Sequence, residues 1–146
     1  MRNAKKTNSK SFIKIKGDFN VETNTPLVSI YAHNIYSTGD LEVDGEIIAK
    51  NITTKESYNK SGNLDVTESV KVECNIITAG NVSILKDCRC KKIESGGSIS
   101  ISSDCICDLI KANGNVYITG KCSCKIESII TPPGAEVFID NKFIRR

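Results

Sequence analysis

Three cysteine pairs, each of the form C-x-C, recur at a fixed spacing of 17 residues and constrain the fold more than any other feature. The pairs are Cys88/Cys90, Cys105/Cys107 and Cys122/Cys124. Ahead of each pair stands the phrase G-x-[VI]-x-I, which begins at Gly80, Gly97 and Gly114. A constant period of this size indicates one structural unit repeated along the chain.

The same repeat extends towards the N-terminus and covers most of the chain. Glycines followed by alternating apolar residues also stand at Gly17, Gly39 and Gly62, and a variant with one inserted residue begins at Gly134. A second phrase joins an apolar residue, a small residue and an isoleucine. Its copies are Ile30-Ala32-Ile35, Ile47-Ala49-Ile52, Val72-Cys74-Ile77, Cys88-Cys90-Ile93, Cys105-Cys107-Ile110 and the shorter Cys122-Cys124-Ile126. In this alignment Cys74 shares the slot of Cys90, Cys107 and Cys124.

Alternation with a period of two places the apolar residues of each phrase on one face of a short strand. Three strands of about five residues a side account for the repeating unit. We therefore predict an all-β chain, folded as a single-stranded right-handed parallel β-helix of about six 17-residue coils with three short strands per coil. A β-sandwich also uses many short strands, but it predicts no constant register.

The pattern also predicts the domain boundaries. Residues 1–11 are polar and charged without periodicity, which predicts a disordered basic N-terminal tail. The β-helix is expected over residues 12–141, with a loop insertion at 55–62, and residues 142–146 are expected to form a basic C-terminal tail. The absence of Trp and the scarcity of other aromatics suit many short strands better than a helical bundle.

The net charge of +3 hides an asymmetry, because residues 1–16 carry six basic side chains and no acid. A basic arm that includes Arg2, Lys5, Lys6 and Lys10 could contact nucleic acid, anionic lipid or a neighbouring copy, and the simpler interpretation is a solvated tail. No apolar run approaches the roughly 18 residues of a transmembrane segment. The N-terminus also lacks the apolar core of a secretory signal, so we expect a cytoplasmic protein.

The cysteines are a candidate soft-metal site, because C-x-C thiolates can bind zinc or copper. In a strand, however, positions i and i+2 point the same way, into slots that other coils fill with Ile, Val or Ala. Buried cysteine behaves there as a small hydrophobe. Stacked disulfides are disfavoured by parallel Cβ vectors and a reducing cytosol. We therefore expect core residues and no cofactor, with metal binding by the six paired cysteines as the alternative.

Nothing in the sequence predicts an enzyme. His33 is the only histidine, and no motif places an acidic or serine partner beside it. A phosphate-binding loop, a zinc-binding helix motif and a nucleophile elbow are all missing from the sequence. We expect no catalytic residue and interpret His33 as a surface residue near a corner.

The stretch from Gly17 to Ile139 resembles the bactofilins, the polymer-forming cytoskeletal proteins of bacteria. The resemblance is carried by GDLEVDG at Gly39 to Gly45, by GAEVF at Gly134 to Phe138, and by the repeated register between them. It implies a short central β-helix between short tails. It also implies a structural protein that assembles end to end into nucleotide-independent filaments or scaffolds. The partner would be another copy of the chain, with protein clients as further partners, and head-to-head and tail-to-tail contacts would make the filament nonpolar.

A β-helix has two ends at which strand edges and core are open unless something caps them. The sequence offers no helical cap, so apolar residues of the first and last coils are candidate self-assembly contacts. These are Phe12, Phe19, Val21, Val137, Phe138, Ile139, Phe143 and Ile144. Alternatively, Phe138 and Phe143 fold over the last coil as a plug and leave a monomer. The competing functional hypothesis is a monomeric β-helix module that binds or inhibits a protein or nucleic acid through its basic arm or a flat wall.

Overall fold

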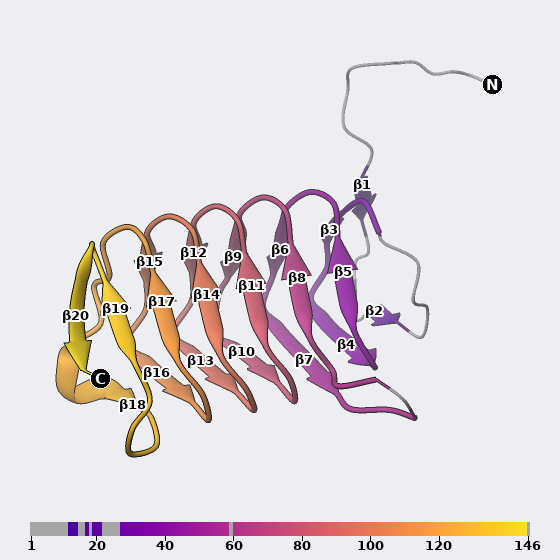
Figure 1. Ribbon diagram of the computed structural model, residues 1–146. Coiled ribbons are helices and arrows are strands. Elements are labelled where there is room, and N and C mark those ends of the chain that lie inside the picture. Colours follow the sequence, from indigo (N-terminus) through magenta and orange to yellow (C-terminus); the bar gives the residue numbers. More distant parts are fainter. Residues whose placement is uncertain (1–11, 15–16, 18, 22–26, 59, 146) are drawn as a thin grey trace.

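The computed structural model describes residues 12–14, 17, 19–21, 27–58 and 60–145. These residues form a parallel β-solenoid of about seven turns with three strands in each full turn, which confirms the predicted β-helix (Figure 1). The strands of one sheet run upwards at the front of Figure 1, and the chain then crosses to the back. Because the turns advance from right to left in that view, the coil is right-handed.

Three sheets form the walls of the solenoid, and each is a stack of equivalent parallel strands from successive turns, to which sheet 3 adds the antiparallel β20 at one edge. Sheet 1 contains β1 (Phe12–Lys14), β3 (Ser29–Tyr31), β6 (Ile47–Ala49), β9 (Val70–Val72), β12 (Cys88–Arg89) and β15 (Cys105–Ile106). Sheet 2 contains β2 (Phe19–Val21), β4 (Asn34–Thr38), β7 (Asn51–Lys55), β10 (Asn75–Thr78), β13 (Lys92–Ser95), β16 (Leu109–Ala112) and β18 (Ile129–Ile130). Sheet 3 contains β5 (Leu41–Val43), β8 (Leu64–Val66), β11 (Val82–Ile84), β14 (Ile99–Ile101), β17 (Val116–Ile118), β19 (Val137–Ile139) and β20 (Lys142–Arg145).

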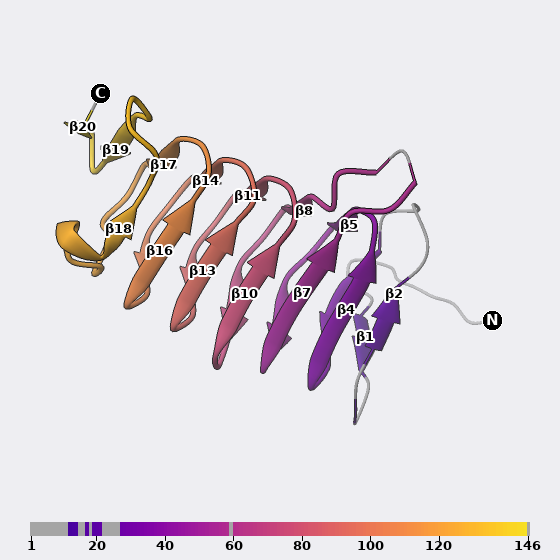
Figure 2. The same ribbon diagram turned by 90° about the horizontal axis from the view of Figure 1, so that it is seen from below.

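Identical or similar apolar side chains stack between turns and fill the interior. In sheet 2, Ile93 pairs with Ile76 on one side and Ile110 on the other, and all three are fully buried. Sheet 3 repeats this arrangement with Val82, Ile99 and Val116. The strand period of two explains why each buried residue is flanked by residues that face solvent. Figure 2 shows sheet 2 from below as a row of arrows from β4 to β16.

Short polar side chains satisfy the backbone at the corners between sheets. The side-chain oxygen of Asn63 accepts the backbone N–H of Asn81, and that of Asn81 accepts the N–H of Ser98, both at 2.8 Å. At the inner end of sheet 2, the buried hydroxyls of Thr78 and Ser95 both donate to the carbonyl of Gly80, at 2.9 and 2.8 Å. Each turn is therefore tied to the next by side chains as well as by strand hydrogen bonds.

Two details of the predicted register are wrong. In the third coil the inward pair is Val70/Val72 rather than Val72/Cys74, because Val70 pairs with both Ile47 and Cys88. Cys74 lies half-buried at a corner, and Ile76 rather than Ile77 occupies the buried isoleucine slot. The repeat needs only two alternating apolar or small residues, and the segment Val70-x-Val72-x-Cys74 contains three. The sequence alone therefore fits the pair Val70/Val72 and the pair Val72/Cys74 equally well.

The last turn also differs from the prediction. Ile126 is 53% exposed and lies in a short 3-10 helix, η2 (Ile126–Ser128), while Ile129 pairs with Ile110 in its place. Because η2 inserts extra residues, the isoleucine that stacks on Ile110 comes three residues later in the sequence than predicted. Lys142–Arg145, assigned from the sequence to a basic tail, forms β20, which pairs antiparallel with β19. Residues 56–63 lie between β7 and β8 and include an antiparallel bridge between Ser57 and Lys60.

Candidate functional site

The N-terminal end of the solenoid is formed by the outermost strands of sheets 1 and 2. β1 pairs only with β3 and β2 only with β4 among the described strands. Val21 is buried, and Phe19 packs half-buried against the same core. Phe12 contributes its backbone to β1, and its side chain lies outside the described structure. No described helix or strand lies over these two strands, so their outer backbone edges have no strand partner in the described part of the chain.

The basic arm lies outside the described part of the chain. Arg2, Lys5, Lys6 and Lys10 all belong to residues 1–11, so the contacts proposed for them stay predictions.

The C-terminal end is closed by a β-hairpin. β19 and β20 are joined by Asp140 and Asn141, whose φ angles of 53° and 64° are those of a tight two-residue turn. Val137 is fully buried, and Ile139 packs against the core. Ile144, the extra residue where the register of β20 shifts against β19, packs against the same core.

Phe138 and Phe143 do not plug the interior. Their rings meet edge to face, with centroids 4.9 Å apart. Phe138 pairs with Tyr117 on the outward side of sheet 3, between the inward-facing Val137 and Ile139. The aromatic pair therefore lies on the outer wall at the C-terminal end, where Phe143 is 46% exposed.

Arg145 fastens the hairpin to the neighbouring sheet. Its guanidinium donates to the carbonyl of Ile129 at 2.7 Å, and longer contacts of 3.4 Å reach the carbonyl of Ile126 and the hydroxyl of Thr131. The side chain thus spans from β20 in sheet 3 to η2 and β18 in sheet 2. We call this set of contacts the Arg145 clasp. It was not predicted from the sequence, although Asp140-Asn141 between two apolar alternations is a recognisable hairpin signal.

The six paired cysteines gather in the interior of the last three turns, beneath sheet 1. Cys88, Cys105 and Cys122 form one column, since each pairs with the next across the sheet. Cys90, Cys107 and Cys124 follow two residues later in the same three turns. Five of the six are buried, Cys122 is half-buried, and all seven cysteines of the chain are free thiols. The inward orientation is the one that the alternating pattern predicts.

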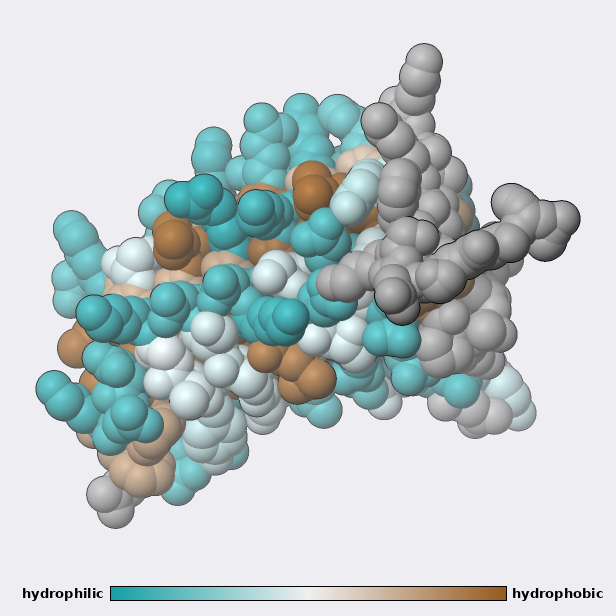
Figure 3. All heavy atoms as spheres, turned by 90° about the horizontal axis from the view of Figure 1, so that it is seen from above, coloured by the Kyte–Doolittle hydropathy of each residue, from teal (hydrophilic) through white to brown (hydrophobic). Residues whose placement is uncertain are grey.

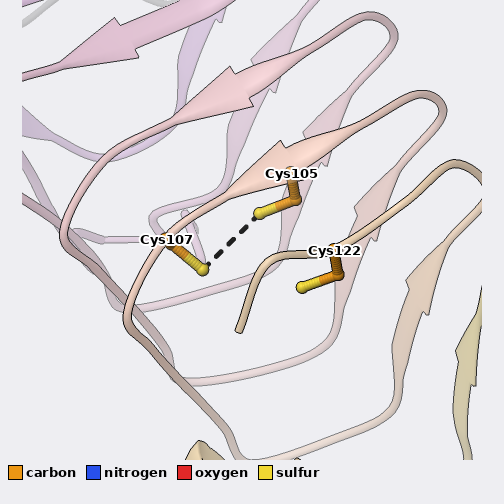
Figure 4. Close-up of side chains that lie close together, drawn as sticks. All are labelled: Cys105, Cys107 and Cys122. Atoms are coloured by element: carbon orange, nitrogen blue, oxygen red, sulfur yellow. Dashed lines mark hydrogen bonds between the residues drawn. The ribbon is translucent and has the colours of Figure 1, made fainter. Parts of the chain in front are cut away.

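Three of these sulfurs converge on one point. The Sγ atoms of Cys105, Cys107 and Cys122 all lie within 4.8 Å of one another, and those of Cys105 and Cys107 are 3.6 Å apart (Figure 4). We call these three residues the thiol triangle. In Figure 4 Cys105 and Cys122 project from stacked segments, and Cys107 turns towards them from the following corner. Cys74 is not part of this group.

Contacts between the thiols redistribute their affinity for protons. Hydrogen bonds from Cys107 and then Cys88 lower the pKa of Cys90 to about 5. The hydrogen bond with Cys105 raises the pKa of Cys107 above its usual range, and the same partner does so for the pKa of Cys88.

The outer walls carry no described constellation with the features of a catalytic site. His33 is exposed at a corner, as predicted. Hydrogen bonds to Glu46 and Glu136 raise the pKa of Tyr31 and Tyr117, which keeps both phenols protonated. From above, apolar side chains reach the surface as small separate patches among hydrophilic ones (Figure 3). No helix in the described ranges is long and apolar enough to cross a membrane.

Comparison of the chain with protein-family models, with curated proteins and with solved structures gives no match. The geometry of this chain is therefore the basis for what it is proposed to do.

Proposed function

We propose that this chain is a structural protein that self-assembles end to end, without nucleotide, through the ends of its β-solenoid. The observation that carries the proposal is the N-terminal end, where β1 and β2 are the outermost described strands of their sheets and Phe19, the first residue of β2, packs only half-buried against the core. Outermost strands present backbone groups that can pair with another chain. Apolar side chains at the same surface add the burial that such pairing needs.

Contact between the N-terminal ends of two copies would pair the outermost strands and bury apolar side chains at the same time. A two-fold axis between the ends would bring each β1 or β2 against a strand of the second copy, which is a self-complementary contact. Phe19 would then be buried from both sides. This contact alone closes and yields a dimer.

Growth beyond a dimer needs the C-terminal end as well. That end is fastened by the Arg145 clasp, and the outermost strand of sheet 3 is β20, with Phe138 and Phe143 on the adjoining wall. We expect the contact between C-terminal ends to be the weaker of the two, since Ile144 already covers core there. Dimers should therefore form first and join into nonpolar filaments at higher concentration.

The test compares charge substitutions at the two ends with one on a wall. Phe19→Asp should abolish the dimer, and Phe138→Arg should leave the dimer but prevent filaments. Tyr36→Asp is the matched control, because Tyr36 is an exposed aromatic residue on the outer face of β4, one turn from Phe19. Circular dichroism establishes that each variant keeps its β structure.

Particle size over a wide concentration range, followed by electron microscopy, provides the measurement. The proposal requires wild type and Tyr36→Asp to grow alike without nucleotide. It fails if wild type stays monomeric at all concentrations and salt levels, a result that would favour the monomeric binding module. It also fails if folded Phe19→Asp assembles like wild type.

A further inference from the structure

We propose that the thiol triangle of Cys105, Cys107 and Cys122 is a binding site for a single copper(I) ion inside the solenoid. The inference is independent of self-assembly, since the triangle lies in the interior of the last turns and uses no residue of the N-terminal end.

The packing of the core does not by itself account for six cysteines in one place. The slots that Cys88 and Cys105 occupy in sheet 1 are filled by Ile30, Ile47 and Val70 in earlier turns. The following slots hold Ala49 and Val72. Aliphatic side chains thus fill the equivalent positions in the earlier turns. The cysteine thiols differ from them in that they can also act as metal ligands.

The sulfur positions suit a metal ion with three ligands. If three sulfurs lie no more than 4.8 Å apart, a point between them is within about 2.8 Å of each, and a metal–thiolate bond is about 2.3 Å. Small side-chain rotations therefore complete the coordination. Such rotations leave the backbone register of Cys105 and Cys122 unchanged.

The number and type of ligands favour copper(I) over zinc. Structural zinc sites take four ligands in a tetrahedron. The thiol triangle supplies three among the described residues, and no histidine or carboxylate joins the group. Thiolates are the ligands that copper(I) prefers, and this closed-shell ion accepts two or three of them. Burial of Cys105 and Cys107, at 1% and 2% exposure, would also shield a bound copper(I) from water and oxidants.

Binding exchanges protons for the metal without a redox step. Each thiol that becomes a ligand loses its S–H proton to solvent, and copper enters and stays as copper(I). A surface hollow of about 280 Å³, lined by Cys107, Asp108, Ser123, Cys124, Lys125 and Ser128, gives access to the second column of cysteines.

The experiment loads the fully reduced full chain with copper(I) under anaerobic conditions, with a chromophoric copper(I) chelator as competitor. We expect one tightly held copper(I) per chain, with sulfur-only coordination in X-ray absorption. Cys107→Ala should weaken binding at least tenfold and keep the fold, because Ala49 occupies the corresponding position in an earlier turn. Cys105→Val provides a second variant of the triangle, chosen because Val70 fills the same slot two turns earlier.

Cys74→Ser is the matched control, since Cys74 lies at a corner away from the triangle. It should bind copper(I) like wild type. The proposal is overturned if the chelator strips wild type completely, if Cys107→Ala and Cys105→Val bind as tightly as wild type, or if zinc(II) competes copper(I) out at equal concentration. Particle size of Cys107→Ala keeps the two proposals distinct, because loss of copper should leave end-to-end assembly unchanged.

Discussion

Removing the guanidinium of Arg145 should open the C-terminal end of the solenoid without unfolding the rest. Arg145→Met keeps much of the apolar stem and deletes the clasp. The bond to the carbonyl of Ile129, at 2.7 Å, is the only short one of the three contacts. A hydrogen bond from a charged donor contributes about 1.5–3 kcal/mol when buried, but Arg145 is exposed, so we expect a loss of about 1 kcal/mol.

The effect should be local, because each turn of a solenoid contacts only its neighbours. A loss of about 1 kcal/mol raises the population of the open end about fivefold. Amide hydrogen exchange should therefore accelerate by about that factor in β18 and β20 and stay unchanged in β10 and β13. An opened end should also associate more readily, which particle size at high concentration would reveal.

Lys142→Met is the control, since Lys142 is the exposed cation at the first position of β20 and its side chain makes no hydrogen bond or ion pair with the described residues. Unchanged exchange in β18 and β20 of Arg145→Met would refute the clasp. If Lys142→Met accelerated hydrogen exchange in β18 and β20 as much as Arg145→Met does, the clasp would also be refuted, because the effect would then come from the loss of a positive charge. Uniform acceleration in every turn would contradict the nearest-neighbour behaviour of the fold.

Three further substitutions test the interior, the charges and the corners. Ile93→Ala removes a fully buried side chain from the middle of a stack and should lower the free energy of unfolding by about 2–5 kcal/mol in denaturant titrations. Partial desolvation and then the nearby carboxylates of Glu42 and Asp40 raise the pKa of Asp65, although its side chain faces solvent. The ionised form therefore opposes folding slightly, so Asp65→Asn should give a small rise in the melting temperature at pH 7, and this gain should vanish as the pH falls through the pKa of Asp65. Gly62 has a φ of 80°, and an added Cβ would lie 2.8 Å from the carbonyl carbon of Lys55, so Gly62→Ala should lower the melting temperature, whereas an unchanged value would contradict this strained corner.

Most of the fold follows from two periodicities in the sequence. The 17-residue spacing fixes which residues stack, as in Ile93 on Ile110, and the period of two fixes which of them face inward. Both periodicities can be read directly from the sequence, so predicting the stack needs no knowledge of contacts between distant residues. They fail where a coil changes length, as before Ile76, and where a helical turn is inserted, as before Ile129.

The candidate sites were harder to predict because they depend on contacts between non-equivalent positions. The clasp joins Arg145 to a carbonyl sixteen residues earlier, and no repeat relates those two positions. The cysteine columns are visible in the sequence. The convergence of three sulfurs is not, because it depends on how the side chain of Cys107 turns back from its corner towards Cys105 and Cys122.

The central claim is that the solenoid associates through its N-terminal end, and sedimentation velocity of wild type beside Phe19→Asp tests it most directly. With nucleotide-free protein at rising concentration, association through this end predicts a shift of wild type from monomer to dimer and larger species, while folded Phe19→Asp remains a monomer. A single monomeric boundary for wild type at every concentration, or identical profiles for the two proteins, would contradict it.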